Sequence, residues 1–389
     1  MSRIGHLSLL AATYVVLAGS LGPFIRGGGD TEGAWLPGAG HLAGEGCTIE
    51  VHLEVALGAE HDPASVISGQ GVSVAWADGL GWIVSDFPAD VLTYSPDGRF
   101  RGRLGEPGQG PGEWSRPARV VADRNDSIWV SNLQGRAVVF APDGTPSRTL
   151  SSPQLLPIDG FLDDGNPYSL VFRPSPEDRT QGLRTQGTLL ARAWDRANGE
   201  PAGDLGPGAV DGPGPPALTP MLIGPGTVAS GSSLYAAVNP ELWLARWTAA
   251  GEDTIATGQQ VAAGLREVGV DALGDLPQPE GIAVAPDDGF WLLGSLRVLG
   301  DEEEQALREE ESTARGRTPT ALEVTRSPNV LNRVYDGLLL HLTRDGQVTA
   351  AVRFDEPPFG FVSNAARFYT LAHTDTGLLQ VRIWGFECR

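Results

Sequence analysis

The chain has 389 residues, with 28 Lys and Arg against 48 Asp and Glu, which gives a formal net charge of -20 at pH 7. A chain this acidic repels phosphate backbones and anionic lipid surfaces, so neither nucleic acid nor a membrane surface is an expected partner. The 52 Gly and 30 Pro are too many for a helical protein, and 41% hydrophobic residues are too many for a disordered one. Composition therefore predicts a turn-rich all-β domain.

The first 26 residues have the pattern of an export signal. Arg3 precedes an apolar run from Leu7 to Leu21, and Ala18-Gly-Ser20 is a small-x-small site for a signal peptidase. We expect residues 1–26 to direct export to the periplasm or the cell exterior. The alternative is an uncleaved N-terminal anchor, which would be the chain's only attachment to a membrane. Residues 27–46 are rich in Gly, without periodicity, and are predicted to be a flexible linker.

A pair of β-rich runs recurs along the next part of the chain. The segment Trp82-Ile-Val-Ser-Asp-Phe-Pro-Ala-Asp-Val-Leu-Thr-Tyr-Ser-Pro-Asp-Gly98 returns as Ile128-Trp-Val-Ser-Asn-Leu-Gln-Gly-Arg-Ala-Val-Val-Phe-Ala-Pro-Asp-Gly144. A unit of short strands cannot cover its own faces, so such copies are expected to stack against one another. The repeat predicts a single domain over residues 47–389 built from similar β-sheets.

Strand-like runs divide this domain into six units. Units one and two each contain four strands, and unit three is less regular. The sixth unit ends one strand short after Leu378-Leu-Gln-Val-Arg-Ile-Trp384. The alternating segment from Thr48 to Leu57 is an obvious donor of the missing strand. We therefore predict a six-bladed β-propeller in which an N-terminal strand closes the last blade and removes the open sheet edges.

The two cysteines fit this closure. If residues 378–387 and 48–57 pair as antiparallel strands, Cys388 and Cys47 lie at adjacent strand ends. Oxidation persists outside the cytosol, so we predict a Cys47–Cys388 disulfide. It would take the place of a covalent turn and stabilise the fold by roughly 4–5 kcal/mol in the chain-entropy treatment.

The segments Ile128 to Gly144 and Pro279-Glu-Gly-Ile-Ala-Val-Ala-Pro-Asp-Asp-Gly-Phe-Trp-Leu-Leu293 resemble the repeats of six-bladed NHL-repeat-like and TolB-like β-propellers. Arg103-Leu-Gly-Glu-Pro-Gly-Gln-Gly-Pro-Gly-Glu-Trp114 resembles an inter-blade linker of bacterial exported propellers of uncharacterised function. The resemblance covers roughly residues 47–388. It implies the fold, but no activity, because binding scaffolds, lactonases, lyases and receptor modules share this architecture.

In a four-stranded blade, the loops between the second and third strands and the loops between blades lie on one face, which is the default ligand site. The residues predicted for this face are Asp86, Asp90, Glu113, Trp114, Arg116, Asn132, Arg136, Arg173 and Asn239. For each of them the competing interpretation is a turn residue with a structural hydrogen bond. An insertion in blade five, about residues 296–336, begins with a predicted helix from Asp301. It is expected to act as a lid or to be a charged surface excursion.

The leading hypothesis is a monomeric scaffold that binds a protein, peptide or glycan and needs no cofactor. No Gly-x-Ser-x-Gly elbow is present, and no histidine pair has the spacing of metal ligands. The expected role of His341 and His373 is structural. The alternative is a metal-dependent propeller enzyme of the lactonase or lyase kind, with a divalent cation at the channel mouth. Its candidate ligands are Asp159, Glu280, Asn132 and Asn364.

Overall fold

A computed structural model describes residues 47–58, 63–68, 71–87, 90–174, 187–207, 227–237, 244–270, 278–314, 328–374 and 376–389. The predicted signal or anchor at residues 1–26 and the predicted linker at 27–46 lie outside the described residues. No helix in these ranges is long and apolar enough to cross a membrane.

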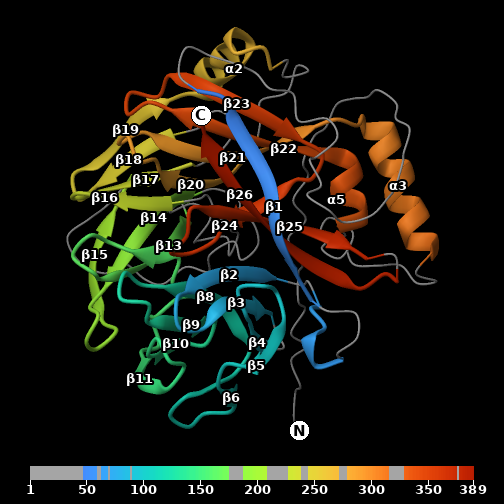
Figure 1. Ribbon diagram of the computed structural model, residues 1–389. Helices are drawn as coiled ribbons and strands as arrows, with labels where there is room; N and C mark the ends of the chain where they lie inside the picture. Colours follow the sequence, from blue (N-terminus) through green and yellow to red (C-terminus); the bar gives the residue numbers. More distant parts are fainter. Residues whose placement is uncertain are drawn as a thin grey trace, which may run out of the picture.

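The chain folds into a six-bladed β-propeller, and each blade is a four-stranded antiparallel sheet (Figure 1). The first blade contains β2 (Val72–Ala77), β3 (Gly81–Asp86), β4 (Asp90–Tyr94) and β5 (Phe100–Arg103). The second contains β8 (Pro117–Ala122), β9 (Ile128–Asn132), β10 (Arg136–Phe140) and β11 (Pro146–Ser151). The two-residue strands β6 (Glu106–Pro107) and β7 (Glu113–Trp114) pair within the linker between these blades.

The remaining blades follow in chain order. The third has β12 (Gly160–Phe161), β13 (Pro167–Pro174), β14 (Gly187–Trp194) and β15 (Pro201–Leu205). The fourth has β16 (Thr227–Ser230), β17 (Ser233–Ala236), β18 (Leu244–Thr248) and β19 (Gly251–Ala256). The fifth has β20 (Gln278–Val284), β21 (Phe290–Arg297), β22 (Tyr335–Leu342) and β23 (Val348–Phe354). In the sixth, β24 (Pro358–Phe361), β25 (Arg367–His373) and β26 (Leu379–Cys388) are completed by the N-terminal β1 (Ile49–Leu57).

The predicted closure of the ring is confirmed. Strand β1 pairs antiparallel with β26, from Ile49 opposite Cys388 to Leu57 opposite Val381. Beyond the last strand pair, the Thr48 N–H donates to the Arg389 carbonyl at 2.8 Å and the Arg389 N–H donates back at 3.0 Å. The Cys47–Cys388 disulfide joins the same ends with a Cα–Cα distance of 5.4 Å. Hydrogen bonds and a covalent link therefore hold the last blade together.

The hydrophobic core is divided into clusters between neighbouring blades. Val84 and Leu92 of the first blade pack with Leu371 of the sixth, and Trp129 of the second packs with Trp194 of the third. All six blade interfaces contain such a cluster. Because neighbours cover both faces of a blade, β3 and β9 are buried at every position. This burial explains why the second strands read as continuous apolar runs rather than alternating ones.

The recurring Pro-Asp-Gly turn places a glycine against the preceding blade. Gly98 and Gly144 both have a φ of +83°, in the left-handed region where a Cβ is disfavoured. A Cβ on Gly98 would lie 2.5 Å from Val55 Cγ2, and one on Gly144 would lie 3.2 Å from Leu80 Cδ2. The motif therefore serves both the turn and the contact between blades.

Among the described residues, three helices and a 3-10 turn lie outside the sheets. The 3-10 turn η1 (Pro63–Ser65) follows β1. Helix α2 (Gly258–Glu267) begins with a Thr257–Gln260 capping box and buries Val261 and Leu265 against the fifth blade. The sequence analysis did not predict this helix.

The insertion in the fifth blade contains α3 (Asp301–Ala314), the predicted acidic helix, and α5 (Pro328–Val334). Helix α5 contacts β22 and β25, and both helices lie beside the ring in Figure 1. The Asn332 side chain donates to the Leu371 carbonyl at 3.0 Å. The described part of the insertion is thus fixed to the sixth blade. Residues 315–327, between the two helices, lie outside the described residues.

Candidate functional site

The antiparallel order of each blade gives the ring two distinct faces. Turns between second and third strands and connections between blades leave from one face, here called the loop face. Turns between first and second strands and between third and fourth strands leave from the other, here called the turn face. The α3–α5 insertion joins the second and third strands of its blade and so leaves from the loop face. The disulfide lies at the end of β26 that meets β1, on the turn face.

Three of the residues predicted for ligand binding are buried and hold the loops in place. Asp86 accepts hydrogen bonds from the Ser68 N–H at 2.7 Å and from the Ser68 hydroxyl at 2.8 Å. Asn132 accepts from the Gln134 N–H at 2.9 Å and donates to the Ser115 carbonyl at 3.1 Å. Trp114 is only 2% exposed, and its indole N–H donates to the Leu104 carbonyl at 2.7 Å. Trp114 was predicted for the ligand face, but its ring belongs to the core between blades one and two.

Three more predicted residues make local contacts. The Glu113 carboxylate accepts from the Gly110 N–H at 2.7 Å within the linker. Arg136 donates to the Gln109 carbonyl at 2.6 Å, so it fixes the same linker to blade two. Asp90 pairs with Arg103 at 3.0 Å on the outer strands of the first blade. For these residues the structure supports the loop-ordering interpretation.

Arg116 is different because its side chain is exposed and its backbone is strained. Its φ is +49°, whereas the other non-glycine residues with positive φ in the described chain are Asp126, Asp288 and Asn364. Asp and Asn tolerate this region and a long side chain rarely adopts it, so an outlier of this kind often marks a functional position. The guanidinium lies over the Phe87 ring at 5.7 Å from its centroid. This pair forms the exposed loop-face rim between blades one and two.

The two remaining predicted side chains, those of Arg173 and Asn239, fall outside the described part of the chain. Arg173 belongs to β13, but its side chain lies outside the described part of the chain, and Asn239 lies entirely outside it.

The centre of the ring contains a polar group that the sequence analysis only partly identified. Arg119, on the innermost strand of blade two, forms an ion pair with Asp159, which precedes the innermost strand of blade three. Asp159 also accepts from the Leu170 N–H at 2.6 Å. Burial raises the pKa of Asp159 above its usual range, although the Arg119 charge and the Leu170 hydrogen bond act in the opposite direction. The side chain of Asp159 is 9% exposed and that of Arg119 is 35% exposed.

Glu280 extends from the innermost strand of blade five, which is opposite blade two in a six-bladed ring. One of its carboxyl oxygens accepts from the Ser295 hydroxyl at 2.9 Å. Burial raises the pKa of Glu280 to about 7, against an ordinary value of 4.5, and the Ser295 hydrogen bond only partly offsets this. The residue nevertheless keeps some exposed surface. Arg119 and Glu280 therefore both keep some exposed surface on innermost strands.

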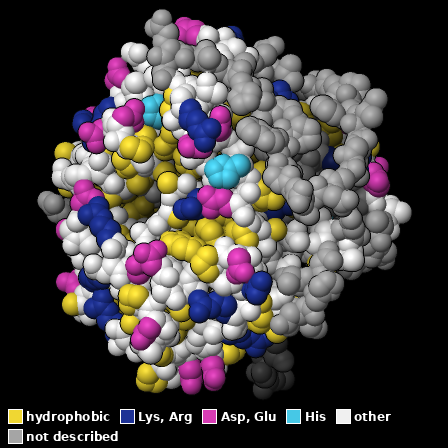
Figure 2. All heavy atoms as spheres, viewed as in Figure 1, with side chains coloured by type: hydrophobic (Ala, Val, Ile, Leu, Met, Phe, Trp, Pro, Cys, Tyr) yellow, Lys and Arg dark blue, Asp and Glu magenta, His cyan; other side chains and the backbone are white. Residues whose placement is uncertain are grey.

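Two tyrosines connect these groups around the channel. The Tyr369 hydroxyl donates to the Val72 carbonyl at 2.9 Å, and burial raises its pKa to about 12, with smaller effects from the charges of Arg119 and Glu280. The Tyr168 hydroxyl lies 2.8 Å from the Thr227 hydroxyl. We call the six residues the channel cluster: Arg119, Asp159, Tyr168, Glu280, Ser295 and Tyr369. Figure 2 shows a hollow near the centre of the ring, with hydrophobic side chains around it.

The four residues proposed as metal ligands do not converge. Asp159 and Glu280 reach the channel, whereas Asn132 is a buried cap on the loop face. Asn364 lies on the turn face, where its side chain donates to Asp126 at 2.8 Å. Within the described ranges, no three His, Cys, Asp or Glu side chains are grouped as a metal site.

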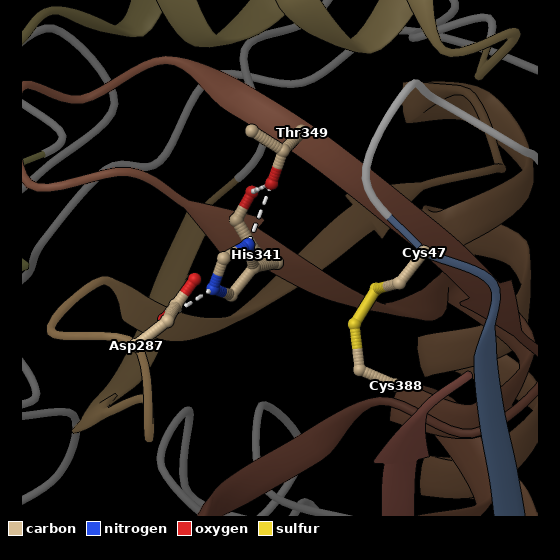
Figure 3. The surroundings of a disulfide bond; sticks show 5 residues. All are labelled: Cys47, Asp287, His341, Thr349 and Cys388. Carbon is tan, nitrogen blue, oxygen red and sulfur yellow. Dashed lines mark hydrogen bonds and ion pairs between the residues drawn. A yellow bond between two sulfur atoms is a disulfide. The ribbon is translucent and has the colours of Figure 1, made fainter.

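A histidine network lies on the turn face, near the disulfide (Figure 3). His341 is 7% exposed, and its Nε2 atom lies 3.1 Å from an Asp287 carboxylate oxygen. Its Nδ1 atom lies 2.6 Å from the Thr349 hydroxyl, and its ring packs against Trp291. An Asp-His-Thr set superficially suggests a nucleophile. However, Thr349 also donates to the His341 carbonyl at 3.3 Å, so the network ties two turns of blade five together. The prediction of a structural His341 agrees with these contacts.

The sequence analysis missed Arg119, Tyr168, Ser295 and Tyr369. Only Arg119 gave a usable signal, since it interrupts the apolar run Pro117-Ala-Arg-Val-Val121 of a predicted inner strand. A charge within such a strand must either face the channel or find a buried partner, and Arg119 does both. The other three are ordinary strand residues, which only the blade register brings to the centre.

No family model matches the chain, and no curated protein matches its sequence. A putative exported protein from Bacteroides fragilis is 9% identical over 88% of this chain and 95% of its own, with a TM-score of 0.46. A protein of unknown function from Bacteroides caccae is 11% identical over 72% of this chain and 80% of its own, with a TM-score of 0.38.

Proposed function

We propose that the protein is an exported propeller scaffold that binds a protein, peptide or glycan ligand through its loop face. The observation that carries this proposal is the position of the N-terminal attachment. The chain enters the propeller at Cys47 on the turn face, where the disulfide joins it to Cys388. A tethered or anchored protein would therefore present its loop face away from the attachment. That face carries the Arg116–Phe87 rim and the blade-five insertion.

The Cys47–Cys388 disulfide supports export, because such links persist in oxidising compartments.

Two exposed arginines of blade two offer a matched test of the binding face. Arg116 lies on the loop face, and Arg124 lies on the turn face with 69% of its side chain exposed. A photoreactive residue placed at either position should give covalent adducts in the native envelope fraction only from position 116. Equal adducts from both positions, or adducts only from position 124, would contradict a loop-face site.

The rival function, a metal-dependent enzyme, makes a different prediction. Asp159 is already neutralised by Arg119, which leaves Glu280 as the one channel-cluster carboxyl without a cationic partner. Elemental analysis of the purified protein, with thermal unfolding in Ca²⁺, Zn²⁺ or Mn²⁺ and in chelator, separates the two. A scaffold should show no stoichiometric ion and no chelator-dependent melting temperature. A bound ion that shifts the melting temperature would favour the enzyme.

A further inference from the structure

We propose that the channel cluster binds a zwitterionic ligand, namely a free amino acid or short peptide, with its carboxylate on Arg119 and its amine on Glu280. This inference rests on the proposed ligand-binding function and narrows it to one part of the molecule and one class of ligand. Neither residue was predicted for the loop-face set, so the channel site is testable separately from the rim.

Arg119 has N–H donors that its ion pair with Asp159 does not use. A guanidinium carries five N–H donors, and the Asp159 pair engages the Nη1 atom. Asp159 is itself fixed by the Leu170 N–H, so the arginine is held in place before any ligand arrives. The partly exposed remainder of the fork suits a carboxylate, because guanidinium and carboxylate form two parallel hydrogen bonds.

Glu280 has a carboxyl oxygen that its hydrogen bond with Ser295 does not use. Ser295 occupies one carboxyl oxygen, and the second remains available to a donor from the channel. An isolated buried carboxylate is costly, so a bound ammonium group would stabilise its ionised form. Two tyrosines that Glu280 influences electrostatically, Tyr335 and Tyr369, are neutral near pH 7. Neither supplies the missing positive charge.

Arg119 and Glu280 together favour a ligand that carries both charges. Arg119 and Glu280 lie on blades two and five, which face each other across the ring. A purely anionic ligand would meet Glu280 and a chain of net charge -20, and a purely cationic ligand would leave the remaining N–H donors of Arg119 without an acceptor. A molecule with a carboxylate at one end and an amine at the other satisfies both walls without net charge.

Blocked peptides test each contact separately. Calorimetric titration of the purified full protein at pH 8 would use alanine, dialanine and trialanine, then trialanine N-acetylated or C-amidated. We expect at least one unblocked probe to bind. Either blocking group should weaken trialanine binding by about 10-fold or more, as for loss of a charge-assisted hydrogen bond.

Variants identify the residues involved. Glu280→Gln should weaken the binding of unblocked trialanine by a similar factor. It should leave the affinity for N-acetylated trialanine unchanged. Arg119→Lys keeps the positive charge beside Asp159 but cannot form two parallel hydrogen bonds to a carboxylate. It should therefore weaken the binding of unblocked trialanine and leave the affinity for the C-amidated peptide unchanged. Arg246→Lys is the matched control, because Arg246 pairs with Asp253 on the outer strands of blade four. This variant should bind each peptide with the affinity of the wild type. Circular dichroism and the melting temperature verify that each variant is folded.

Two results would overturn the inference: no binding of any unblocked probe at millimolar concentration, or binding that neither the blocking groups nor the two channel variants change. Adducts from position 116 would still be expected in either case. Failure at the channel is therefore distinguishable from failure of the loop-face function.

Discussion

At the scale of single residues, Glu280 links the channel to the stability of the fold. Its pKa rises from 4.5 to about 7 because burial disfavours the charged carboxylate. Between these values the folded protein holds a proton that the unfolded chain has released. Stability from this group is therefore greatest below about pH 4.5 and falls as the pH rises to 7. Above pH 7 the penalty is complete, on the order of 1–3 kcal/mol for a partly exposed group.

Glu280→Gln should remove this penalty. The amide oxygen can still accept from Ser295, and no charge has to be buried. We expect the variant to be more stable than the wild type by about 1–3 kcal/mol at pH 8, and by only about a quarter of that amount at pH 5. Urea unfolding at both pH values measures the difference. Glu302→Gln, on an exposed position of α3, serves as the control for a Glu-to-Gln change outside the channel. Equal stability of Glu280→Gln and wild type at both pH values would show that the carboxyl is well solvated.

At the scale of elements, the glycine turns show how a short motif fixes the spacing of blades. Gly98 and Gly377 have nearly the same backbone conformation, with φ of +83° and +84°, but different surroundings. A Cβ on Gly98 would collide with Val55, whereas a Cβ on Gly377 would meet nothing within 4 Å. The pair therefore separates the cost of the conformation from the cost of the contact.

Both alanine variants should be destabilised by about 1 kcal/mol because of the positive φ. Gly98→Ala should lose about 1–3 kcal/mol more, because β1 must move away from the turn. Chemical denaturation of the two variants side by side measures this. If the two losses are the same, the turn of blade one does not rest firmly on β1, and the proposed role of the repeat is wrong.

These elements also show what could be predicted from sequence. The second and third strands were found because neighbouring blades bury both their faces, which leaves long apolar runs such as Ile128 to Val130. The closing strand could be predicted because the sixth unit ends one strand short and residues 48–57 alternate, and Cys47 and Cys388 then fall at matching ends. Helix α2 was missed although Thr257 and Gln260 form a capping box, because the expectation of an all-β chain overrode that local signal.

The candidate site was predicted much less well than the fold. Most of the predicted loop residues are polar, but polar side chains also form the hydrogen bonds that hold a loop in its own conformation. Asp86 and Asn132 are examples. The channel cluster depends on which inner-strand residues point into the ring. That depends on strand register and bulges, such as the irregularity between Pro279 and Gly281 beside Glu280. One sequence does not specify these features.

At the scale of the whole molecule, the propeller is a closed ring in which hydrophobic clusters are shared between blades. Opening the ring between any two blades exposes both sides of the hydrophobic cluster that they share. The stability of the fold therefore depends more on closure of the ring than on where the chain begins and ends. Here closure combines the β1–β26 pairing with the disulfide. A short covalent turn between residues 389 and 47 would provide the same restraint, since Thr48 and Arg389 are already a hydrogen-bonded pair.

This argument predicts the behaviour of a circular permutant. Residue 389 would be joined to residue 47 through a Gly-rich linker of about four residues. The chain would be opened between Ala249 and Ala250, two exposed residues in the turn before Gly251, with residues 1–46 kept in front of the new N-terminus. We expect the permutant to fold with the β-sheet circular dichroism of the parent. Its melting temperature should be nearly insensitive to reductant, because the turn retains the connection after the disulfide is reduced.

The parent protein behaves differently under the same argument. Without its disulfide, β1 is held by its pairing with β26, by the Arg389–Glu50 and Arg367–Glu54 ion pairs, and by packing against blades five and one. The parent should lose about 3–5 kcal/mol on reduction, the amount expected when a long loop is opened. Amide exchange should then appear first in β1 and β26, whereas in the permutant it should start at the new ends in blade four. A permutant that stays unfolded, or one that is as sensitive to reductant as the parent, would show that the N-terminal strand must join last for the ring to form.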